Sequence, residues 1–156
     1  MDRLDIIESL KHTPDAVSAA IEGVPEGVLR FRPAEGEWSI NEVIGHLRDK
    51  AEIWGRRLYM VYSQTDPVLP SFDGEASVVD HDYQDADPRR LIAEMRELRL
   101  QTVAMLDHAP DWTRIGQHGD MGRRTLKQFA EALVEMEAEH IDQVRANKAA
   151  AAAASR

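Results

Sequence analysis

The stretch 125–144, TLKQFAEALVEMEAEHIDQV, decides the fold. It begins with a capping box, in which the Thr125 hydroxyl and the Gln128 side chain can each satisfy a free amide at a helix start. Apolar residues then recur every three or four positions, the spacing of a helix with one face in a core. That face comprises Leu126, Phe129, Ala130, Leu133, Met136, His140 and Val144. The stretch therefore predicts a long amphipathic helix.

Helix-start signals recur along the chain. Ser39 and Glu42 form a second capping box, and Asp87-Pro88 places a capping side chain before a proline at the first helical position. No segment alternates apolar and polar residues between turn signals, so the evidence for strands is thin. We therefore predict an all-α protein, an up-down four-helix bundle. Its helices are expected at 3–22 (kinked or restarted at Pro14), 40–64, 88–108 and 125–148, with a short helical turn at 25–30.

A long loop, residues 64–87, separates the second and third long helices. Connections of this length are uncommon and usually form a lid, a binding loop or an interface. The alternative is a crossover that joins helices that are not neighbours. We expect residues 1–148 to form a single domain. The alanine-rich C-terminal tail, 149–156, either extends the last helix or is frayed.

The composition excludes several classes of function. The chain has 156 residues, no cysteine and a net charge of −9, so thiolate catalysis and cysteine-ligated metals are ruled out. An acidic surface repels phosphate backbones and anionic membranes. The N-terminus lacks the apolar core of a signal peptide, and no apolar run is long enough to span a bilayer. We expect a soluble cytoplasmic protein whose partners are small molecules or another copy of the chain, with neither nucleic acid nor membrane among them.

Ionisable residues lie within the apolar stripes of two predicted helices. Glu137 and His140 share the stripe of the last helix, while His46 lies to one side of the stripe of the second. Buried groups of this kind need partners, because desolvation without hydrogen bonds is costly. One interpretation is that Glu137 and His140 satisfy each other and a nearby tryptophan or arginine. The other is that imidazoles from two helices converge on a divalent cation.

Two blocks of sequence carry a resemblance to a known family. The stretch 36–54, GEWSINEVIGHLRDKAEIW, is similar to the WS..E...HL.D signature of the DinB-like (YfiT-like) four-helix-bundle superfamily. The stretch 114–144, RIGQHGDMGRRTLKQFAEALVEMEAEHIDQV, resembles the last-helix motif of that superfamily. A weaker block at 93–106, AEMRELRLQTVAML, extends the resemblance over most of the chain.

This resemblance implies a site. In that superfamily, one histidine of the second helix and two histidines spaced by four on the last hold nickel, zinc or a similar divalent ion. Carried over by position, the ligands fall on His46, Met136 and His140, with Gln143 matching a following glutamine. A thioether is a soft, weak ligand for zinc or nickel. The triad is therefore incomplete unless Glu137, which follows Met136, or a loop carboxylate supplies a third ligand.

Two functions remain open at this stage. The resemblance implies a divalent-metal-dependent hydrolase or thiol-S-transferase acting on a small molecule, with zinc or nickel on His46 and His140 and with Glu137 as a ligand or catalytic base. The alternative is a non-catalytic, metal-free bundle in which Met136 fills the place of the missing ligand. Such a bundle would bind a small ligand or act as a dimeric interaction module. Under both hypotheses the resemblance implies a homodimer.

Overall fold

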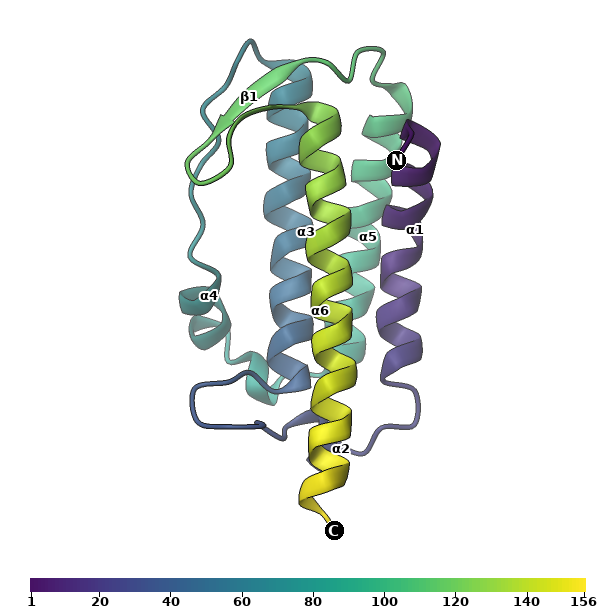
Figure 1. Ribbon diagram of the computed structural model, residues 1–156, viewed down its shortest axis with the longest axis vertical. Coiled ribbons are helices and arrows are strands. Elements are labelled where there is room, and N and C mark those ends of the chain that lie inside the picture. The colour runs from purple at the N-terminus through teal and green to yellow at the C-terminus, as the bar shows by residue number, and fades with distance from the viewer.

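The computed structural model of the chain describes residues 1–156 and confirms the predicted four-helix bundle (Figure 1). Four long helices make up the bundle, and the shorter elements lie in the connections between them. The elements in chain order are α1 (Arg3–Ala20), α2 (Glu26–Leu29), α3 (Ile40–Ser63), α4 (Gly74–Asp80), the 3-10 turn η1 (Tyr83–Asp85), α5 (Pro88–His108), β1 (Ile115–His118), β2 (Gly122–Thr125) and α6 (Leu126–Ala154). No helix is long and apolar enough to cross a membrane.

The predicted helix starts are confirmed by their caps. The Ser39 hydroxyl accepts from the Glu42 amide at 3.2 Å, and the glutamate side chain accepts in return from the Ser39 amide. Thr125 begins α6 through a matching capping box, and the Asp87 side chain caps α5 ahead of Pro88. Each cap satisfies an amide that the helix itself leaves free, which is why these sequence signals located the starts.

The four long helices do not alternate in direction along the chain, as a simple up-down bundle would. Both α1 and α3 pack against α5 and α6. Contacts between α3 and α5 advance together along both helices, from the ion pair of Arg48 with Glu94 to the close approach of Gly55 to Thr102. The two helices therefore run parallel, and the segment 64–87 has to return along the length of the bundle (Figure 1). It is a crossover, as one of the two interpretations proposed, but between parallel neighbours rather than between helices that lie apart.

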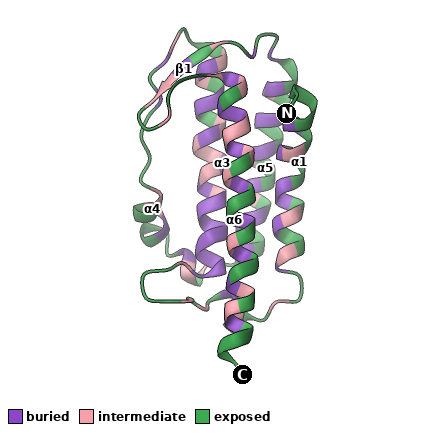
Figure 2. Cartoon of the chain, viewed as in Figure 1, coloured by how far each residue is buried: buried purple, intermediate pink, exposed green.

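The core consists of two clusters of buried side chains, one centred on Trp54 and the other on Ile44. Figure 2 shows that α3 is the helix most fully lined with buried residues. Trp112, in the connection between α5 and α6, is 4% exposed and belongs to the first cluster. It closes one end of the bundle beneath the guanidinium of Arg3.

The helix does not restart at Pro14, one of the two outcomes expected there, because α1 continues through this residue. A proline has no amide proton, so the carbonyl four residues earlier, that of Leu10, loses its helical partner. A guanidinium nitrogen of Arg99 donates to this carbonyl at 2.9 Å. Arg99 is 3% exposed, and it also pairs with Glu137 on α6. A buried side chain of α5 thus replaces the missing helical hydrogen bond of α1.

The connections hold more regular structure than the sequence indicated. The expected loop 64–87 contains α4 and η1, and β1 and β2 form an antiparallel hairpin before α6. The backbone of Leu69 is bonded to this hairpin, because its N–H donates to the Gln117 carbonyl at 2.8 Å. Arg57 of α3 donates two hydrogen bonds to the Pro70 carbonyl, at 3.1 and 2.7 Å. At the other end of the chain, residues 149–154 of the alanine-rich tail continue α6 as helix.

Candidate functional site

A cleft of about 560 Å³ lies where the beginning of α3, the beginning of α4 and the middle of α6 meet. The structure brings two of the predicted site residues together here. The imidazole rings of His46 and His140 lie edge to face, with centroids 4.8 Å apart. The Trp38 ring lies 4.7 Å from that of His46. The cleft is lined by Trp38, His46, Ser71, Phe72, Asp73, Gly74, Glu75 and His140.

The position of α4 against the histidines depends on Gly74. A Cβ atom at this residue would lie 2.7 Å from Cε1 and 3.0 Å from Nδ1 of His46, so only glycine allows α4 to begin here. Asp73 caps the helix by accepting from the Ala76 amide at 3.1 Å. The sequence Asp73-Gly74 therefore sets both the start of α4 and its contact with the imidazole.

His46 is held as a neutral imidazole. Its side chain is 7% exposed, and its Nδ1 is buried without a hydrogen-bond partner. Burial, together with the smaller effects of the nearby His140 and Lys50, lowers the pKa of His46 to about 3. An imidazole that stays unprotonated at neutral pH keeps a lone pair available for a proton donor or a metal ion.

His140 has a defined orientation. Its Nδ1 lies 3.0 Å from Oε1 of Gln143, one turn further along α6. An amide oxygen can only accept, so the proton of a neutral His140 sits on Nδ1, and Nε2 carries the lone pair. Gln143, which the resemblance singled out, thus acts by orienting His140.

Glu137 is not brought to the two histidines. Both of its oxygens accept from Arg99, one of them at 2.8 Å, and its side chain is 2% exposed. The nearby arginine expected in one interpretation is therefore Arg99, whereas His140 pairs with Gln143 and not with Glu137. Met136 packs against the first core cluster. A ligand or base role for Glu137 beside His46 and His140 has no geometric support.

These residues do not form a complete site for a catalytic metal ion. Catalytic zinc is held by three protein ligands with a fourth position open to water or substrate. Here two imidazoles meet, the third position of the superfamily pattern is Met136, and Glu137, which follows it, is paired with Arg99. No group of three histidine, aspartate or glutamate side chains is placed to hold a metal ion.

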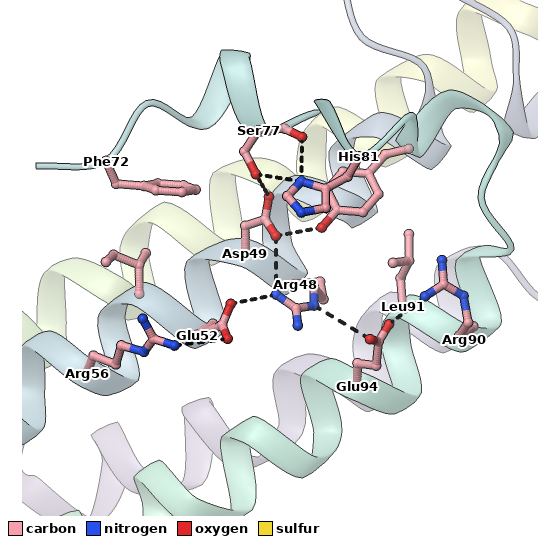
Figure 3. Close-up of a pocket in the computed structure, with 12 residues that line it drawn as sticks. Arg48, Asp49, Glu52, Arg56, Phe72, Ser77, His81, Arg90, Leu91 and Glu94 are labelled. Atoms are coloured by element: carbon pink, nitrogen blue, oxygen red, sulfur yellow. Dashed lines mark hydrogen bonds and ion pairs between the residues drawn. The ribbon is translucent and has the colours of Figure 1, made fainter. Parts of the chain in front are cut away.

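A second pocket, of about 320 Å³, lies on the other side of α4 (Figure 3). Its centre is Asp49, which is 5% exposed and accepts from the hydroxyls of Ser77 and Tyr83, both at 2.6 Å. Burial and this hydrogen bond raise the pKa of Tyr83. Tyr83 can reach Asp49 because its ring lies directly against Gly45 of α3, where a Cβ would be 2.2 Å away.

The cluster of Ser77, His81 and Asp49 has the residue types of a hydrolytic triad, but its hydrogen bonds do not allow His81 to act as a base for Ser77. Nδ1 of His81 lies 2.9 Å from the Ser77 carbonyl, which can only accept, so this nitrogen carries a proton. It therefore cannot take the proton of the Ser77 hydroxyl, which donates to Asp49 instead. The cluster fixes α4 to α3. Sequence reasoning missed it because no local pattern links Asp49 to residues 28 and 34 positions further along.

Comparison with known proteins identifies the family. The family model of the DinB superfamily matches residues 9–144, so the chain belongs to the DinB superfamily. Among solved structures, it is similar to YfiT from Bacillus subtilis, described as a probable metal-dependent hydrolase with an unusual four-helix bundle topology. The TM-score is 0.86 and the identity 23%, over 93% of this chain and 85% of the YfiT chain. No curated protein matches the sequence.

Proposed function

We propose that this DinB-superfamily chain binds a small molecule in the cleft between α3, α4 and α6, with His46 and His140 as hydrogen-bond acceptors and without a resident metal ion. The observation that carries the proposal is His46. A polar side chain that is nine-tenths buried is normally hydrogen-bonded, yet its Nδ1 has no partner in the protein. This nitrogen is itself covered beside Gly74, so a ligand with a proton donor would meet the ring at its other nitrogen, Nε2. Trp38 and Phe72 supply apolar surface for the rest of the ligand.

A second candidate function is a divalent-metal-dependent hydrolase or thiol-S-transferase. It is favoured by the meeting of two imidazoles from different helices, with ring centroids 4.8 Å apart. Zinc or nickel would be held by His46 and His140. A third ligand would have to come from outside the chain, since Glu137 is bound to Arg99 and no other carboxylate completes a group of three with the histidines. Two imidazoles alone hold such ions weakly, so this function requires the ion and the small molecule to bind together.

Metal analysis and ligand binding separate the two candidates. Protein purified without chelator is expected to contain well under one divalent ion per chain, in an amount that His140→Ala does not change. Fragments that bind are expected to shift the ¹³Cε1 resonances of His46 and His140, and to lose affinity in His140→Ala but not in the control His12→Ala, whose residue is exposed on α1. One equivalent of metal that disappears in His140→Ala would establish the second candidate instead.

Pairing of two chains, which the resemblance implies, is a separate proposal. It is tested by sedimentation equilibrium, where a dimer has twice the 17.6 kDa mass of the chain. A monomer at micromolar concentration would overturn it without affecting the cleft.

A further inference from the structure

The histidine cleft continues into a second hollow of about 450 Å³. The two share Trp38 and Glu75, so they lie side by side around the tryptophan. The second hollow is lined by Gly36, Glu37, Trp38, Glu75, Gln143, Ala146 and Asn147. Asn147 supports its floor by donating to the Trp38 carbonyl at 2.8 Å. The combined surface is large enough for a ligand of moderate size.

The charged side chains that line this surface are all acidic, although the Lys50 ammonium acts on His46 from outside the lining. Three carboxylates line it, those of Glu37, Asp73 and Glu75, whereas no lysine or arginine lines either hollow. Asp73 is partly engaged as the cap of α4. Glu37 and Glu75 are exposed at the rim, and neither takes part in an ion pair. The unpaired rim carboxylates attract cations and repel anions.

The floor of the cleft suits a cation that also donates hydrogen bonds. The half-buried Trp38 presents an indole ring, the aromatic system that best stabilises an adjacent ammonium group. Nδ1 of His46 is covered beside Gly74, so a donor can approach that ring only at Nε2. On His140, Nδ1 is bonded to Gln143, which leaves Nε2 for a ligand. Ammonium N–H groups donate only, so neutral imidazoles and carboxylates are complementary to them.

We propose that the ligand of this cleft is a small organic amine, whose ammonium group lies beside Trp38 between the carboxylates of Glu37 and Glu75 and donates to the histidines. This inference rests on the proposed function, since it gives the chemical class of the ligand that the cleft binds. It goes beyond that function in two ways. It excludes anionic ligands, and it assigns the preference for a cationic ligand to Glu37 and Glu75 rather than to the two histidines.

Three probes of equal shape test the class of ligand: benzylammonium, benzyl alcohol and benzoate, titrated by calorimetry in the presence of a chelator. Benzylammonium is expected to bind roughly five- to thirtyfold more tightly than benzyl alcohol, the combined effect of a cation–π contact and two rim carboxylates. Benzoate is expected not to bind. Equal binding of the amine and the alcohol would overturn the amine assignment while leaving the cleft as a binding site. Failure of all three probes to bind, with no shift of the Trp38 indole signal, would overturn both.

A charge-matched pair of variants tests the residues. Glu37→Gln/Glu75→Gln is expected to weaken benzylammonium binding about three- to tenfold. Glu97→Gln/Glu135→Gln removes the same charge from exposed positions outside the cleft and is expected to leave the affinity unchanged. Equal losses in the two double variants would show that only net charge matters, which would refute the assignment of Glu37 and Glu75. Because the substituted side chains are exposed, both variants are expected to unfold at the midpoint of the parent protein, which urea unfolding checks.

Discussion

Glu137→Gln separates a structural role of this residue from a role at the cleft. The substitution leaves the Arg99 guanidinium, 3% exposed, without its counter-charge. Removing one member of a buried ion pair typically costs about 3–5 kcal/mol in the free energy of unfolding. With a urea dependence of about 2 kcal/mol per molar, that loss moves the unfolding midpoint down by roughly 2 M. The exposed neighbour Glu135, changed to Gln, should leave the midpoint within about 0.3 M.

The double variant Arg99→Met/Glu137→Met completes this experiment. Replacing a buried ion pair by apolar side chains is often neutral or stabilising. The Leu10 carbonyl, however, would lose the side-chain donor that replaces its helical partner at Pro14, at a cost of about 1–3 kcal/mol. The double variant is therefore expected to lie between Glu137→Gln and the parent protein in urea unfolding at pH 7. If Glu137→Gln unfolds at the parent midpoint yet lowers ligand or metal affinity, Glu137 belongs to the cleft and the structural reasoning is wrong.

Three further predictions concern the cleft. The His46 pKa, lowered to about 3, lies below its unfolded value of 6.5, so the unfolded chain binds more protons between these pH values and stability falls as the pH drops below 6.5. By pH 5 the loss in the free energy of unfolding amounts to about 2 kcal/mol. Urea unfolding of His46→Gln should not show this loss. If NMR shows that His46 titrates near pH 6.5, the prediction is wrong. Gly74→Ala should cost about 1–3 kcal/mol by forcing α4 away from His46, whereas Gly27→Ala, with no atom near its added Cβ, should not destabilise. Met136→His restores the three-histidine pattern of the superfamily and should raise bound zinc or nickel toward one equivalent per chain by elemental analysis; unchanged metal content would show that this position does not face His140.

Signals confined to a few neighbouring residues were sufficient to predict the long helices. Ser39, Asp87 and Thr125 each satisfy an amide within the following three residues, so their caps can be read from the sequence. The hairpin before α6 has no comparable signal, because its strands are only four residues each and neither alternates apolar and polar side chains. The restart expected at Pro14 was wrong because nothing near this residue in the sequence shows how its missing hydrogen bond is replaced. The side chain that replaces its missing hydrogen bond, that of Arg99, comes from another helix.

The candidate site was predictable only in part. Helical periodicity placed Glu137 and His140 on one stripe, but it does not give the register of α6 against α3 and α5. That register sends Glu137 to Arg99 and His140 to His46. The pairing of the two histidines was expected from the resemblance to the DinB-like superfamily rather than from spacing. The part of the cleft contributed by α4 depends on Asp49, which anchors that helix through contacts distant in sequence.

The crossover segment also determines how fast a ligand can reach the histidines. Arg57 holds it at the Pro70 carbonyl, and Asp49 holds it again at Ser77, so the backbone over the cleft is fixed on both sides. Opening it as a flap would break these partly buried hydrogen bonds at both anchors, a local unfolding event on a timescale of about microseconds or longer. Phe72, which is 36% exposed between the two anchors, needs only a side-chain rotation, on the order of nanoseconds or less. Exchange of ligand is therefore expected to be limited by diffusion and by the strength of binding, with no slow conformational gate.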